Sequence, residues 1–507
     1  MPSTRTFFVR WVSLALALSA GPLLGVPASL AAQWDAPVQV VRAPLAPGEL
    51  ALDATLSFRW ADSWIGGQDF ASIYQQGDAL DLFDTEGRLA SSLATLGVDG
   101  VPLVSGATDA AIQTSQTRIP LTIRAGLPWQ LELEATMRFV RTRLEADTRL
   151  LAATEATLGR SPALDDPTPV QTFVDEVVSA TSGFSAGGRD WEAWGAAWRS
   201  AYRASVLFPS ADSDAATRLL AELDALNTAL AADGRTPVVA TPLFATAPLT
   251  ADGYLGLPSG APYGITPFEA APFLWRNGDV DVVLHRQVAS REGVAPWALR
   301  ASAGLRIPVA QQVDPDLPFA TAAGAGVLAA LVGAEGWYGA GRFAASGSVR
   351  ATFNGSRDVA SRIGPVDQAY LGLDSRTGLS WTPGSRVLGH LRAEFTPAGP
   401  LRLEAGYSFD LRGDDSFTRL GPIPEFDEGQ ALPTPVFYGD ASILGQGTGG
   451  TVHWARGGIR WVPSSPGAFG VSLDVGAPIA GNVPRGYEWT ELRLRVHRTI
   501  DLARILN

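Results

Sequence analysis

Strict alternation of apolar and polar residues constrains this chain more than any other feature. Between Trp129 and Phe139 every odd position is apolar and every even position is polar or charged. The segments 52–60 and 401–412 repeat the pattern. Successive side chains of a strand point to opposite faces of a sheet, whereas a helix would scatter the same residues around its circumference. The pattern therefore predicts β-strands with one apolar face and one charged face.

Segments with weaker alternation bring the number of predicted strands to about 12, within a range of roughly 10–14. Each segment is near the length that a tilted membrane strand needs. The 54 Gly and 36 Pro also favour many short strands and turns over long helices. Turn residues at 126–128, 383–385 and 397–400 predict antiparallel hairpins. The weaker strands are expected at 119–125, 280–284, 297–307, 337–353, 369–381, 387–395, 452–461, 469–477 and 487–496.

The spacing of these strands predicts that the long connections share one side of the sheet. With an even number of strands, the connections 61–117, 142–278, 309–336 and 413–450 all fall on the side opposite the two termini. Membrane barrels combine short periplasmic turns with long external loops in this way.

Alternation alone also fits a soluble β-sandwich, so a second feature has to distinguish the two. Aromatic residues near strand ends favour the barrel, because tryptophan and tyrosine form girdles at membrane interfaces. Strands that face lipid must close on themselves, since open edges do not persist in hydrocarbon. We therefore expect an all-β, antiparallel transmembrane β-barrel. The aromatic residues are Trp60, Trp64, Trp129, Trp297, Trp337, Tyr338, Trp381, Trp461 and Trp489.

The first 32 residues have the pattern of a cleaved signal peptide. Arg5 and Arg10 precede an apolar stretch, and small residues follow at 29–32. The alternative is a membrane anchor, but Gly and Pro interrupt the apolar run. We expect residues 33–507 to form a single barrel in the outer membrane of a Gram-negative bacterium. The chain has no Cys, which excludes disulfides and thiolate metal sites.

The connection 142–278 is predicted to be a partly helical insertion. Between residues 168 and 232, Trp191, Trp194, Trp198 and Tyr202 recur at spacings of three and four, which is typical of one helix face. This aromatic face must be buried. It could cover the barrel mouth as a lid, plug the lumen, lie on the membrane surface, or pack within a helical hairpin that stabilises the loop.

Charged strand faces supply the candidate site. If the apolar faces meet lipid, the polar faces point into the lumen. They would form either a charged constriction that filters solutes by size and sign, or an ion-pair network that fills the barrel and keeps it rigid. The candidate lumen-lining residues are Arg59, Glu132, Glu134, Arg138, Arg300, Arg306, Arg350, Arg392, Glu394, Arg402, Glu404 and Asp410.

The sequence gives little support for nucleic-acid binding, catalysis or metal binding. The net charge is −12 and the 39 basic residues are all Arg, without a basic patch for nucleic acid. Residues 183–187 match the G-x-S-x-G pattern of hydrolases, but the alternating strands and helices of that fold are missing around it. His285, His390, His453 and His497 all fall on predicted strands, without the spacing of a zinc site. No enzyme activity, cofactor or metal is expected.

Two regions resemble outer-membrane channels of the phenol-degradation meta-pathway and fatty-acid transporter type. They are the hairpins 386–412 and the ending formed by Val471–Pro478 and Asn482–Gly486. The resemblance covers the strand regions, and the insertion 142–278 has no counterpart in it. It implies a monomeric barrel that passes small, often apolar molecules. The chain departs from other outer-membrane barrels in ending at Asn507 rather than at an aromatic residue.

These features predict a passive outer-membrane channel or transporter for small, including apolar, solutes. Its expected partners are outer-membrane lipid, its solutes and the barrel-assembly machinery. The alternative is a structural or adhesive surface protein, whose barrel is filled by side chains and whose helical loop binds a partner.

Overall fold

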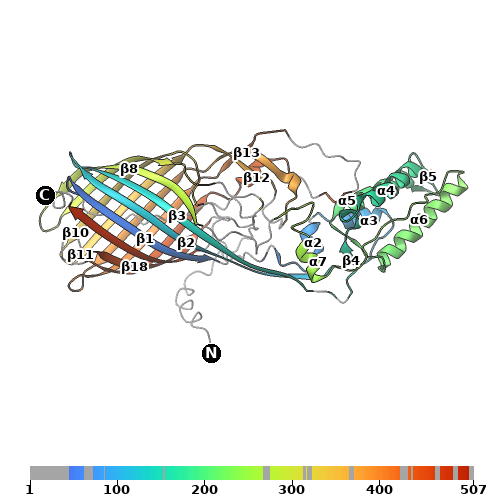
Figure 1. Ribbon diagram of the computed structural model, residues 1–507, viewed down its shortest axis with the longest axis horizontal. Helices are drawn as coiled ribbons and strands as arrows, with labels where there is room; N and C mark the ends of the chain where they lie inside the picture. The colour runs from blue at the N-terminus through green and yellow to red at the C-terminus, as the bar shows by residue number, and fades with distance from the viewer. Residues whose placement is uncertain are drawn as a thin grey trace, which may run out of the picture.

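Twelve strands of the computed structural model form one closed antiparallel barrel (Figure 1). The described residues are 45–61, 72, 74–84, 86–151, 153, 155–265, 275–311, 316, 323–364, 370–422, 432–434, 438–462, 469–482 and 489–501. The predicted signal peptide and the last six residues lie outside them. The barrel strands are β1 (Glu49–Ala61), β2 (Ala107–Leu127), β3 (Leu131–Leu151), β8 (Trp275–Arg291), β9 (Trp297–Ile307), β10 (Ala329–Ala340), β11 (Phe343–Asn354), β14 (Arg386–Phe395), β15 (Leu401–Arg412), β17 (Gly450–Trp461), β18 (Gly470–Gly481) and β19 (Thr490–Asp501).

The barrel closes by pairing its first strand with its last. β1 and β19 run antiparallel from Glu49 opposite Asp501 to Trp60 opposite Thr490, and β1 also pairs with β2. Every barrel strand therefore has two neighbours, which removes the open edges that hydrocarbon would not tolerate. The predicted barrel class and strand number are confirmed.

The strand count agrees because two errors cancel. The segment 337–353, expected as one strand, contains the end of β10 and most of β11, joined by a tight turn in which Gly341 has a φ of 57°. The segment 369–381 was expected in the barrel, but β13 (Arg376–Thr382) pairs with β12 (Arg357–Arg362) and β16 (Ser416–Arg419) in a separate sheet, here called the rim sheet.

Residues 383–385 therefore do not form the expected hairpin turn, because they lead from the rim sheet to β14. The connection 355–385 becomes an additional long one. It joins its strands on the same side as 62–106, 152–274, 308–328, 413–449 and the shorter 482–489, while 128–130, 292–296, 341–342, 396–400 and 462–469 join theirs on the other. The predicted segregation of long loops is confirmed. The two sides are here called the long-loop end and the short-turn end.

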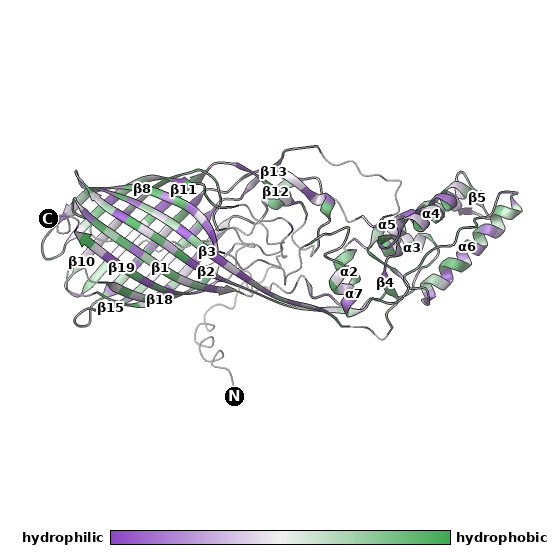
Figure 2. Cartoon of the chain, viewed as in Figure 1, coloured by the Kyte–Doolittle hydropathy of each residue, from purple (hydrophilic) through white to green (hydrophobic). Residues whose placement is uncertain are grey.

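Hydrophobic and hydrophilic residues alternate along the barrel strands (Figure 2), and the barrel is apolar outside and charged inside. Outward residues such as Leu133, Leu403 and Leu473 are exposed, whereas the inward faces of the same strands carry buried arginines and carboxylates. Such a surface is stable only against lipid, so these strands span a membrane. None of the described helices is long and apolar enough to cross a membrane.

The aromatic residues at the short-turn end match the expected girdle. Trp129 is 85% exposed in the β2–β3 turn, and Trp297, Tyr338 and Trp461 are exposed near strand ends. Three other members of the predicted set lie elsewhere. Trp60 is exposed at the long-loop end of β1. Trp489 is buried, and Trp381 belongs to the rim sheet, where it stacks on Phe417. Trp64 lies outside the described residues.

β2 and β3 continue beyond the barrel wall as a two-stranded ribbon (Figure 1). β1 accompanies β2 only as far as Thr114, and β8 accompanies β3 only to Arg141, whereas β2 and β3 pair to Ala107 and Leu151. Residues 107–113 and 145–151 thus pair only with each other, over about 20 Å at ~3.3 Å per residue. The strands are longer than the boundaries 117 and 142 predicted from alternation.

The ribbon leads to an insertion domain formed by residues 74–106 and 155–264, set apart from the barrel at its long-loop end (Figure 1). The predicted helical region is confirmed, and side-chain caps explain where its helices begin. Asp166, Asp190 and Ser213 each accept a hydrogen bond from a first-turn N–H. The domain contains α2 (Leu80–Phe83), α3 (Arg88–Thr95), α4 (Pro167–Thr181), α5 (Trp191–Ala204), α6 (Asp214–Ala232), α7 (Ala251–Gly256) and the short strands β4 (Leu158–Arg160), β5 (Ser185–Ala186), β6 (Arg189–Asp190) and β7 (Leu207–Pro209).

The aromatic face of α5 is buried in the core of this domain. Trp198 packs edge-on against Phe173 of α4 at 4.9 Å and next to Trp194 at 5.9 Å. Leu89 and Leu93 of α3 join the same core. Of the placements left open by the sequence, the packed hairpin is the one observed, and the helices α4, α5 and α6 lie clear of the lumen (Figure 1).

An aromatic cluster ties together three of the long connections. Phe83 stacks on Tyr370 at 5.3 Å and contacts Tyr254 and Tyr263, while Tyr74 meets Tyr370 at 5.6 Å. These residues come from the connections β1–β2, β3–β8 and β11–β14. The cluster therefore holds the insertion domain to loops above the barrel mouth.

Alkaline pH is expected to unfold the insertion domain before the barrel. Burial raises the pKa of Tyr74, Tyr202 and Tyr263 above the ordinary value of 10. Above about pH 10 the unfolded chain loses phenolic protons that the folded domain retains. The stability that the buried tyrosines give to the folded domain is therefore complete below pH 10 and is lost as the pH rises. Near-ultraviolet circular dichroism between pH 8 and 12 measures it. A signal unchanged to pH 12 would contradict the expectation.

The side chain of Arg362, in the rim sheet, binds backbone carbonyls of the insertion domain. Its guanidinium donates to the carbonyls of Tyr263, Gly264 and Leu371 and to the carboxylate of Asp316. Arg362→Met is expected to weaken this attachment by about 2–3 kcal/mol, because buried acceptors lose a charged donor. Faster proteolysis near residue 265 would report the loss.

Arg376→Met is the matched control for that variant. Arg376 binds the same Asp316, at 2.6 Å, but its side chain is exposed. Exposed ion pairs contribute less than ~1 kcal/mol to stability, so the rate of proteolysis near residue 265 should change little in this variant. Equal effects of the two variants would show that Arg362 has no special role in the attachment.

Candidate functional site: the charged lumen

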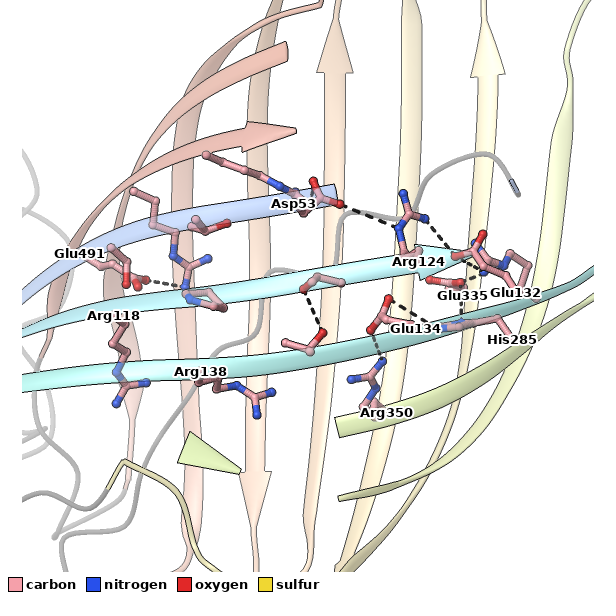
Figure 3. A pocket seen from close by; sticks show the side chains of 18 of the residues that line it. Asp53, Arg118, Arg124, Glu132, Glu134, Arg138, His285, Glu335, Arg350 and Glu491 are labelled. Atoms are coloured by element: carbon pink, nitrogen blue, oxygen red, sulfur yellow. Dashed lines mark hydrogen bonds and ion pairs between the residues drawn. The ribbon is translucent and has the colours of Figure 1, made fainter. Parts of the chain in front are cut away.

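The barrel encloses a polar cavity of about 140 Å³. Its lining comes from β1, β2, β3, β8, β9, β10, β11 and β19, so residues far apart in the sequence meet across the lumen (Figure 3). A smaller cavity of about 30 Å³ lies against β14, β15, β17, β18 and β19. Both volumes are large enough for water, which needs roughly 10–15 Å³ per molecule.

The structure places the twelve predicted lumen residues on inward strand faces. Arg59, Glu132, Glu134, Arg138, Arg300 and Arg350 line the larger cavity. Arg392 and Glu404 line the smaller one. Arg306, Glu394, Arg402 and Asp410 line neither cavity and form ion pairs with neighbouring strands.

Several lining residues were missed by the sequence reasoning. The same alternation rule finds them when it is applied to the weaker segments, because 491, 493 and 495 are the polar positions of the segment 487–496. The missed titratable residues are Asp53, Arg118, Arg124, His285, Glu335, His390, Arg456, Asp474, Glu491, Arg493 and Arg495.

Glu491 is the centre of an ion-pair group that borders the larger cavity. Its carboxylate lies 2.7 Å from Arg59 Nε, 2.6 Å from an Arg493 nitrogen and 3.4 Å from an Arg456 nitrogen. The side chain is 1% exposed. One carboxylate thus serves three guanidinium groups, which leaves this part of the lumen with an excess of positive charge.

On the other side of the larger cavity, acids and bases match more evenly. His285 lies between Glu134 at 3.6 Å and Glu335 at 3.2 Å (Figure 3). Arg300 bridges Glu335 and Glu132, each at 3.1 Å. These contacts join the neighbouring strands β3, β8, β9 and β10 along one side of the lumen, and they fix the positions of the side chains that line the cavity there.

The two sides therefore differ in charge. Among the described residues that line the two cavities, those on β1, β2, β17, β18 and β19 comprise six arginines and three carboxylates. Those on the remaining strands comprise four arginines and four carboxylates. The first group is here called the arginine wall. It consists of Arg59, Arg118, Arg124, Arg456, Arg493 and Arg495.

The chain just before β1 also narrows the lumen at the short-turn end. The Leu45 N–H donates to Glu132 at 3.1 Å. Gly126, on the inward face of β2, permits this approach, because a Cβ there would lie 2.1 Å from the carbonyl oxygen of Ala46. Residues 45 and 46 therefore rest against the inner wall.

The G-x-S-x-G segment is a surface hairpin. Ser185 is exposed on β5, which pairs with β6 in the insertion domain. The four histidines of the chain lie on β8, β14, β17 and β19, as predicted, and all four strands belong to the barrel. Ser185 is therefore on a different part of the molecule from every histidine that could activate it.

No family model and no curated protein matches this chain. Similar solved structures include the COG4313 outer membrane channel from Pseudomonas putida F1, with 10% identity over 90% of this chain and 97% of that one, at a TM-score of 0.41. The translocator domain of the autotransporter NalP from Neisseria meningitidis has 8% identity over 90% and 88%, at 0.31. The CymD monoaromatic hydrocarbon channel has 9% identity over 90% and 88%, at 0.25.

Proposed function

We propose that this protein is a passive outer-membrane channel for small, water-soluble solutes. The supporting observation is a polar cavity enclosed by a barrel whose outer surface is apolar. A solute would pass between the long-loop end and the short-turn end through contacts with charged side chains, without covalent chemistry. Selectivity would follow from the width and charge of the lumen.

The lining argues for polar rather than apolar solutes. Almost all residues around the larger cavity are charged or hydroxylated. An apolar molecule there would displace water from these groups and supply no hydrogen bonds in return. The apolar solutes implied by the family resemblance fit this interior poorly. We propose the outer membrane as the location, with lipid and the barrel-assembly machinery as partners.

Conductance of the purified protein in planar bilayers tests this function. Membrane fractionation and gel mobility with and without heating come first, since closed barrels often stay folded in detergent until boiled. We expect a heat-modifiable protein that conducts in discrete steps. We also expect Arg138→Gln to change ion selectivity, because Arg138 lines the larger cavity. Heat-modifiable protein without any conductance would contradict the channel.

A structural or adhesive role is the second candidate, and the insertion domain favours it. This domain has its own core and is presented on a ribbon away from the membrane strands. Removing residues 74–106 and 155–264 together, with short linkers, distinguishes the two roles. A channel should conduct as well as before the deletion or better. An adhesive protein should no longer bind its partner after the deletion, and neither form of it should conduct. Removing 168–232 alone would expose the apolar face of α3, which packs against α5.

A further inference from the structure

The smaller cavity is surrounded by hydrogen-bond donors that the described protein atoms do not fully satisfy. Nε of Arg392 and both Nε and one terminal nitrogen of Arg456 are buried donors without a hydrogen-bond partner among the described residues. The imidazole of His390, which supplies one donor and one acceptor when it is neutral, is also without a partner there. His390, Arg392 and Arg456 are each more than nine-tenths buried. Buried donors without acceptors are costly, so these groups favour an occupant that accepts hydrogen bonds.

Glycines leave room for such an occupant. A Cβ on Gly406 would lie 3.6 Å from His390 Cε1, and a Cβ on Gly458 would lie 2.3 Å from an oxygen of Asp474. Side chains at these positions would fill the space that the donors face. Glycines of β15 and β17 thus line this cavity together with the guanidinium groups of Arg392, Arg456 and Arg495 and the imidazole of His390.

We propose that this cavity is a binding subsite for a small oxyanion, and that the arginine wall makes the channel prefer anions. The proposal rests on the channel function above. The shared chemistry is that of a carboxylate from an organic acid or of inorganic phosphate. Both present oxygen acceptors that guanidinium groups bind in pairs.

Two features suit the subsite to passage rather than to permanent capture. Glu404 and Asp474 also line the cavity, and their negative charge offsets part of the attraction for an anion. A channel needs binding that is strong enough for entry and weak enough for exit. Arg495 lines both cavities, so an anion released from the smaller one meets the arginine wall of the larger one.

Reversal potentials in a potassium chloride gradient test the proposal. The natural protein should prefer chloride to potassium. Arg456→Gln combined with Arg495→Gln should lower the chloride-to-potassium permeability ratio on the order of tenfold, because two nearby charges are removed from the path. Acetate or phosphate added to one side should slow chloride current in the natural protein and much less in this variant. The binding of one of the two anions alone would still support the subsite and would identify its source.

Arg306→Gln combined with Arg402→Gln is the matched control, since it also removes two charges from the lumen, but from residues that line neither cavity. Arg306 pairs with Asp281 at 2.7 Å. The permeability ratio of the control should change much less, and gel mobility should confirm that all variants fold. Cation preference, equal effects of variant and control, or no response to either anion would overturn the subsite while leaving the channel intact. Absence of conductance in the natural protein would instead overturn the channel.

Discussion

Glu491→Gln is expected to destabilise the barrel by about 3–5 kcal/mol, since removal of one partner leaves buried charges uncompensated. Glu491 is the carboxylate shared by Arg59, Arg456 and Arg493. Replacement by Gln keeps the size of the side chain and removes its charge. The temperature at which the protein loses its heat-modifiable gel form measures the effect.

Glu145→Gln is the control for this change. Glu145 pairs with Arg143 at 3.0 Å on the ribbon, and both side chains are more than half exposed. An exposed pair contributes less than ~1 kcal/mol, so the transition should stay where it is. If Glu491→Gln melted like the natural protein, water in the lumen would already screen the three guanidinium groups, and the ion-pair group would not support the barrel.

Trp198→Ala should unfold the insertion domain and leave the barrel folded. Trp198 is fully buried, and its loss opens a cavity among Phe173, Trp194 and Tyr202. Such truncations cost about 3–5 kcal/mol, which is comparable to the whole stability of a small domain. Limited proteolysis should remove the insertion rapidly, while the gel shift of the barrel is retained.

Trp198→Phe separates packing from aromatic content. It keeps most of the ring contacts and removes an indole N–H that has no hydrogen-bond partner among the described residues. The domain should stay folded, with a smaller loss of stability than in the Ala variant. If proteolysis and barrel melting changed together in Trp198→Ala, the domain and the barrel would form one cooperative unit instead of two.

Alternation predicts the barrel because it shows which face of a strand contacts lipid. It does not show which strands pair with one another. β13 alternates as membrane strands do, since Leu379 is buried against Phe417 and Val359 while its neighbours are not. A half-buried sheet over the rim therefore gives the same period as a wall strand. The tight turn at Gly341 is equally invisible, because alternation continues through it.

Only parts of the insertion domain and of the charged lumen were predicted from the sequence, and the reasons are related. The long helices were found from the spacing of Trp191, Trp194 and Trp198, while α3 is only eight residues long and was taken as loop. The candidate residues came from the most regular segments. Arg59 and Glu491 are 432 positions apart, and they meet only because β1 and β19 close the barrel in one register. No local pattern contains that register.

The ribbon formed by the ends of β2 and β3 is not closed by neighbouring barrel strands, although Gln75 and Gln76 hydrogen-bond to the β2 edge at Ala110 and Thr108. Rows of unpaired N–H and C=O groups invite the addition of a strand from another molecule. Charged side chains stand on this ribbon, with Arg149 and Asp109 paired at 2.6 Å and Arg143 beside Glu145. Two copies approaching edge to edge would have to desolvate these ions. The charged residues of the ribbon therefore oppose edge-to-edge pairing of two copies of the protein.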